Sequence, residues 1–156
     1  MESVVKRVIV GAGGRPEQLA ALRRAAGEAR RHRAELHVVA AYGAGETCRS
    51  GPHSIGTLDL LVAQRAAATA VLREACAKAL GSVRDDLSAV LVAVRGHPAH
   101  VLLQHADDQG DLLVVGIRPA GPVRGAFSRR VARVCLRHAR CPVLVVPHHG
   151  GLTGCQ

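Results

Sequence analysis

Short apolar runs alternate with amphipathic segments along the whole chain. Five apolar runs rich in Val and Leu have the length of strands buried on both faces, and they cover residues 4–10, 36–41, 87–94, 112–115 and 143–146. The first run is interrupted by Lys6 and Arg7. Between them, apolar residues recur with the period of a helix in four segments. The pattern β-α-β-α-β-α-β-α-β predicts a single-domain, doubly wound α/β fold, a Rossmann-like five-stranded parallel sheet with four helices.

Each predicted helix has a recognisable boundary and a buried stripe. Pro16 and Pro98 suit the first positions of the first and third helices, Thr57 can cap the second, and Gly81 ends it. The fourth helix begins at about Phe127. The four stripes are Leu19, Leu22, Ala26 and Ala29; Leu58, Leu61, Val62, Leu72, Ala75 and Ala79; Val101, Leu102 and Ala106; and Val131, Val134, Cys135 and His138.

Two glycine-rich turns follow apolar strands. The first covers residues 11–14, and the second contains Gly116, Gly121 and Gly125, with two prolines in the same loop. A glycine-rich loop that runs into a helix N-terminus presents unpaired backbone N–H groups and the positive end of the helix dipole. Such a loop suits a phosphate-bearing ligand.

Residues 111–147 closely resemble the C-terminal signature of the universal stress protein family. That signature is Gly, two residues, Gly, nine residues and Gly-Ser, followed by a strand like CPVLVV. Gly116 matches its first glycine, Pro119 stands at the second, and Arg129 and Arg130 stand at Gly-Ser. The resemblance covers nearly the whole chain, including the VGxxG turn, the LHVV strand and the GHPAxxLL segment. It implies the strand order 3-2-1-4-5, with a ligand crevice where the turns after the first and fourth strands meet.

The resemblance also implies a function. It is that of a non-catalytic stress-response protein that binds an adenine nucleotide, ATP or AMP, in this crevice. The loop and the resemblance together give the nucleotide-binding candidates Ala12, Gly13, Ala41, Val115, Gly116, Arg118, Gly121, Gly125, Arg129, Arg130 and Val131.

Three departures from the family pattern predict that this binding is weakened or lost. ATP-binding relatives usually carry an acid where this chain has Gly13, Pro119 lacks a backbone donor, and Arg129 brings bulk to the start of the last helix. The alternative is a family member without a nucleotide, acting as a protein-interaction or anion-sensing module. In that interpretation phosphate or sulfate is held by Arg118, Arg124, Arg129 and Arg130.

Composition narrows the set of partners. The formal net charge is +9, but Tyr42 and Phe127 are the only aromatic residues. The core is therefore aliphatic. Because single-stranded nucleic acid is usually bound on aromatic stacking platforms, nucleic acid is not expected as a partner. A solvated basic helix face or a phosphate-bearing small molecule accounts for the charge. The resemblance implies a homodimer through the edge strand from Val143 to Val146, which a second copy would cover.

The remaining patterns argue against other kinds of site. His97, His100 and His105 lie near two aspartates, but GHPAH falls on the ordinary GxPxxxL position of the family, so no metal bound by protein ligands is predicted. No GxSxG or HExxH arrangement occurs, and at most slow, incidental ATP hydrolysis is expected.

Cysteine usage and hydropathy suggest a compartment. The five cysteines form no CxxC pair and are odd in number, which is typical of a reduced cytoplasmic protein. No segment has the roughly 20 apolar residues needed to cross a membrane. We expect residues 1–148 to form the domain and residues 149–156 to be a flexible C-terminal tail.

Overall fold

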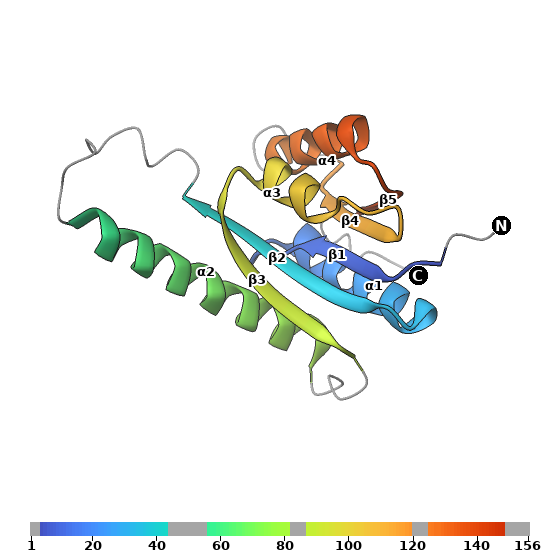
Figure 1. The fold of residues 1–156 in the computed structure, drawn as a ribbon, viewed down its shortest axis with the longest axis horizontal. Coiled ribbons are helices and arrows are strands. Elements are labelled where there is room, and N and C mark those ends of the chain that lie inside the picture. The colour runs from blue at the N-terminus through green and yellow to red at the C-terminus, as the bar shows by residue number, and fades with distance from the viewer. Residues whose placement is uncertain (1–3, 44–55, 82–86, 120–124, 149–156) are drawn as a thin grey trace, which may run out of the picture.

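One parallel sheet organises the computed structural model, which describes residues 4–43, 56–81, 87–119 and 125–148. Its strands are β1 (Arg7–Gly11), β2 (Glu35–Gly43), β3 (Ala89–Gly96), β4 (Asp111–Ile117) and β5 (Val143–Pro147). They lie in the order β3-β2-β1-β4-β5 (Figure 1). This confirms the predicted doubly wound fold and its strand order.

Two helices cover each face of the sheet. α1 (Pro16–His32) and α2 (Gly56–Leu80) pack on one face, and α3 (Pro98–His105) and α4 (Ala126–His138) pack on the other. Because side chains alternate along a strand, Val8 and Val10 of β1 join the core under α1, whereas Ile9 joins the core under α3 and α4. The strands therefore contribute to two aliphatic cores, one on each face of the sheet.

The register of the central strand brings two distant turns together. Val10 of β1 lies opposite Val38 of β2 on one side and Val114 of β4 on the other. The strands are parallel, so the turn after β1 and the turn after β4 leave the same edge of the sheet side by side. This is the switch point at which α/β sheets bind ligands.

Some predicted boundaries are wrong because pairing partners, rather than apolar runs, decide them. β1 begins at Arg7 instead of Val4, since pairing with β2 starts at Arg7 opposite Glu35, and Val4 is 72% exposed. β3 covers Ala89–Gly96, two residues later than predicted at each end. α2 begins at Gly56, so Thr57 lies inside the helix rather than capping it.

Two of the predicted stripes are only partly buried. Leu58 and Val62 of α2 are exposed, because the first turns of this helix reach beyond the sheet (Figure 1). Cys135 of the stripe predicted for α4 is buried, but His138 is exposed. The buried face of α4 also contains Ser128 and Ala132, so it includes a serine that the predicted stripe did not.

The amino-terminal edge of the sheet is tied together by polar side chains. Arg7 donates from Nε and Nη2 to the two carboxylate oxygens of Asp111, both at 2.7 Å, and Asp111 is almost completely buried. Nδ1 of His37 and Nε2 of His105 are 2.9 Å apart in a hydrogen bond, and Nε2 of His37 lies 3.1 Å from a carboxylate oxygen of Glu35. These contacts join β1, β2, α3 and β4 at the end opposite the switch point.

Candidate functional site

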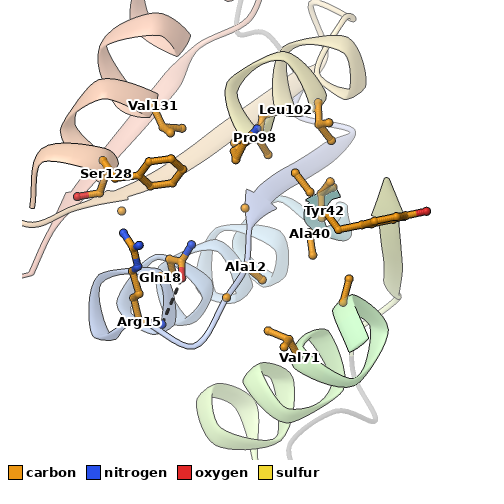
Figure 2. A pocket seen from close by; sticks show the side chains of 18 of the residues that line it. Ala12, Arg15, Gln18, Ala40, Tyr42, Val71, Pro98, Leu102, Ser128 and Val131 are labelled. Carbon is orange, nitrogen blue, oxygen red and sulfur yellow. Dashed lines mark hydrogen bonds between the residues drawn. The ribbon is translucent and has the colours of Figure 1, made fainter. Parts of the chain in front are cut away.

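A cavity of about 470 Å³ lies over the carboxyl ends of β1, β2 and β4. All four helices contribute to its wall, which is mainly apolar. Figure 2 shows Arg15 and Ser128 toward one end, Tyr42 and Val71 toward the other, and Pro98 and Leu102 of α3 on one side. A deep, largely apolar cavity with a few polar groups is the usual form of a small-molecule site.

Six of the predicted site residues line this cavity, although they come from four separate segments of the chain. They are Ala12, Gly13, Ala41, Val115, Gly116 and Val131. The structure therefore brings together the ends of β1, β2 and β4 and the first turns of α4, as the strand order requires.

The predicted arginines do not line the cavity. Nη1 of Arg129 donates to the carbonyl oxygen of Arg118 at 2.9 Å, and Arg130 is exposed on α4. Arg118, Arg129 and Arg130 all lie outside the lining. Gly125 is the N-cap of α4 and also lies outside the lining. Gly121 and Arg124 fall outside the described residues.

Sequence reasoning missed a contact between the two turns. The guanidinium of Arg15, at the start of α1, lies over the ring of Phe127 on α4, with 5.1 Å between the guanidinium carbon and the ring centroid. Both residues line the cavity. This cation–π contact joins the turn after β1 to the helix after β4. A signal was available, because Phe127 is one of only two aromatic residues in the chain.

Ser128 is a second residue that the sequence did not single out. Its hydroxyl oxygen accepts the backbone N–H of Arg118 at 3.2 Å, and the hydroxyl donates to the carbonyl oxygen of Gly125 at 3.1 Å. The backbone N–H of Arg118, just after β4, is thus already bonded. Ser128 donates to a backbone carbonyl and not to a base, so this geometry does not activate it as a nucleophile.

The comparisons with known proteins agree with this geometry. Residues 5–147 match the family model of the universal stress protein family. The chain belongs to this family. A universal stress protein in complex with cAMP is 26% identical, with a TM-score of 0.64, over 92% of this chain and 98% of that chain.

Further universal stress proteins have the same fold. One from Burkholderia pseudomallei is 25% identical, with a TM-score of 0.65, over 95% of this chain and 100% of that chain. The universal stress protein UspA from Lactobacillus plantarum is 20% identical, with a TM-score of 0.63, over 93% and 99% of the two chains. No curated protein matches the chain.

The first glycine of the universal stress protein signature has a structural role here. A Cβ atom on Gly116 would collide with the backbone carbonyl of Glu17 in the first turn of α1. The absence of a side chain therefore allows α1 to lie directly against the end of β4. Gly116 thus brings the amino-terminal end of α1 to the cavity wall.

At Gly13, where nucleotide-binding universal stress proteins usually carry an acid, Gln18 takes the space. A Cβ atom at Gly13 would meet the amide group of Gln18. The same amide oxygen accepts the backbone N–H of Arg15 at 3.2 Å (Figure 2). An acid at position 13 would therefore require Gln18 to move, which a long flexible side chain can do.

Other reactive groups lie away from the cavity. Burial, and to a smaller extent Cys141, raises the pKa of the Cys135 thiol to about 11. At neutral pH this thiol is protonated and a poor nucleophile. Among residues 4–43, 56–81, 87–119 and 125–148, no three His, Cys, Asp or Glu side chains converge as metal ligands. Over the same residues, no helix has the length and hydropathy to span a membrane.

Proposed function

We propose that this universal stress protein binds an adenine nucleotide in the cavity at the carboxyl edge of its sheet. The observation that carries the proposal is the position of the cavity. It lies at the switch point between β1 and β4, and six of the residues singled out from the sequence line it. A universal stress protein of the same fold and 26% identity has been solved in complex with cAMP.

The cavity wall suits the two parts of such a ligand. Pro98, Val101, Leu102 and Val131 provide an apolar surface of the kind that accommodates a nucleobase. The turn after β1 leads through Arg15 into α1, whose amino-terminal end is the positive end of the helix dipole, although the N–H groups of Arg15, Gln18 and Leu19 are already bonded within this turn. A phosphate at this end and a base against the apolar wall is the proposed arrangement.

The proposed activity is binding without catalysis, in a cytoplasmic stress response. Ser128 is held by backbone groups, and the buried Cys135 thiol is kept protonated. Cys135 and Cys141 are buried thiols that form no disulfide with any described residue, which fits a reducing compartment.

The proposed assembly is a homodimer through β5. This strand is an edge of the sheet, and Val143 to Val146 are only partly buried in the single chain. Unpaired backbone groups on an apolar edge are normally covered, and a second copy of the same strand can cover them.

The proposed site can be tested with two neighbouring alanines of α2. Ala66 and Ala67 are both exposed, but only Ala67 lines the cavity. We expect Ala67→Trp to fill the cavity and weaken AMP binding at least tenfold in isothermal titration calorimetry. Ala66→Trp, on the outer face of the helix, should leave the Kd within twofold. AMP binding that survives Ala67→Trp unchanged would exclude this cavity as the site.

The anion-sensing alternative has a specific observation in its favour. Arg118 and Arg129 lie close together outside the cavity, joined by the bond from Arg129 to the carbonyl oxygen of Arg118. Thermal midpoints measured with millimolar AMP, ATP and sulfate separate the two functions. A rise with AMP and ATP alone supports nucleotide binding, and an equal rise with sulfate supports an anion site on the arginines.

A further inference from the structure

Glu17 is an unusual group to find in the wall of a phosphate-binding cavity. It lies in the first turn of α1, lines the cavity and is only 2% exposed. Its Oε1 atom is buried and makes no hydrogen bond with any described residue. Its backbone carbonyl lies against Gly116, the first glycine of the family signature, so the residue stands at the junction of the two turns.

Arg15, close to Glu17 in sequence, and Arg129 of α4 have other contacts. Arg15 places its guanidinium over the ring of Phe127, and Arg129 donates to the carbonyl oxygen of Arg118. The Ser128 hydroxyl donates to the carbonyl oxygen of Gly125. The Oε1 atom of Glu17 receives none of these hydrogen bonds.

A buried carboxylate oxygen without a hydrogen-bond donor is costly, because burial removes its solvation and no hydrogen bond replaces it. The positive end of the α1 dipole offsets part of this cost. A ligand N–H or O–H group would offset more of it, whereas a phosphate would place a second negative charge beside the first. The charge of Glu17 should also be less screened than the charge of a solvated arginine.

We propose that Glu17 is a specificity-determining residue, whose carboxylate accepts a hydrogen bond from the bound adenine ligand and discriminates against phosphate charge. The inference rests on the proposed function, because it assigns the ligand preference of the same cavity. The inference predicts that this chain prefers adenine ligands of low charge. Glu17 should favour the nucleoside over the nucleotide more strongly than a neutral residue at position 17 would.

Adenosine and AMP form the appropriate pair of probes, since they differ only in the 5′-phosphate. Their Kd values are measured by calorimetry at pH 7.5 and constant ionic strength on the full chain and on Glu17→Gln. Glutamine keeps the shape and removes the charge, so the ratio of the AMP Kd to the adenosine Kd should fall at least tenfold. The matched control is Glu74→Gln, which removes the same charge from an exposed position on α2, and its ratio should equal that of the unmodified protein.

A second variant, Glu17→Leu, guards against misfolding of the first. It also lacks the charge, so it should lower the same ratio, and it should weaken adenosine binding because it cannot accept a hydrogen bond. A ratio within twofold of the unmodified protein in both folded variants would overturn the inference and leave the proposed function intact. If neither adenosine nor AMP binds to the unmodified protein or to any of its variants, both the inference and the proposed function are overturned.

Discussion

At the scale of single residues, two glycines shape the candidate site because they carry no side chain. Gly116 allows the first turn of α1 to approach β4, and Gly13 leaves room for Gln18 to bond the N–H of Arg15. Glycine at these positions is therefore explained by close approach, independently of any ligand. The two explanations are compatible, because the approach is what builds the cavity wall.

Gly116→Ala should destabilise the protein by about 1–3 kcal/mol, because the new methyl group would collide with the backbone of Glu17 and force the helix and strand apart. Urea denaturation measures the free energy of unfolding. Gly14→Ala is the matched control, since a Cβ atom there meets nothing within 4 Å. Equal stabilities of the two variants would refute the close approach of α1 and β4.

At the scale of elements, the contacts at the far edge of the sheet link stability to pH. The pKa of His105 is lowered, first by burial and then by the neighbouring His37 and Arg7, while Asp111 and Asp107 act in the opposite direction. The folded protein therefore binds a proton on His105 less readily than the unfolded chain does. Stability contributed by neutral His105 is present above the ordinary histidine pKa of about 6.5 and is lost as the pH falls below it.

His105→Gln removes this titration while keeping a side chain that can donate to Nδ1 of His37. The free energy of unfolding, measured in urea at pH 7.5 and 5.5, should fall less on acidification in this variant than in the unmodified protein. His138→Gln, at an exposed position of α4, should preserve the original pH dependence. An unchanged loss of stability in His105→Gln would show that His105 is not responsible.

The sequence predicted the elements better than their ends. Apolar runs identified every strand, because strands of a doubly wound sheet are buried on both faces. They could not show that β1 starts at Arg7, since that depends on pairing with Glu35. Nor could helical periodicity show that the first turns of α2 extend past the sheet and expose Leu58 and Val62.

Sequence reasoning also predicted some residues of the candidate site and missed others. Residues at strand ends, such as Ala12 and Val115, were predicted from the family resemblance, and the strand order brings them to the cavity. The contact of Arg15 with Phe127 and the burial of Glu17 depend on side-chain directions that no local pattern encodes. The arginines of α4 were placed by spacing, but one of them turns back to the backbone at Arg118.

At the scale of the whole molecule, the open edge at β5 makes a specific prediction about assembly. The N–H of Leu113 donates to the carbonyl oxygen of Pro142, and the N–H of His148 donates to the carbonyl oxygen of Ile117. The backbone N–H and C=O groups of even-numbered residues of β5 therefore point toward β4. The N–H groups of Val143 and Val145 consequently point to the open edge. Pro147, in the same alternation, has no N–H group.

Val145→Pro should therefore keep pairing with β4 and convert a dimer to a monomer in sedimentation velocity measurements, because it removes an outward donor. Val145→Ala is the control, since it loses similar packing but keeps the N–H group. A Val145→Pro variant that stays dimeric and folded would exclude pairing through β5.

The central claim is that the turn after β1 and the carboxyl end of β4 form one binding site for an adenine ligand. A titration of the ¹⁵N-labelled protein with AMP, followed by the backbone amide signals of Gly13 and Gly116, tests it most directly. Both signals should shift together along a single binding curve, while the amides of the basic outer face of α4, such as Arg133 and Arg137, stay in place. Shifts confined to α4, or none at either glycine, would contradict the claim.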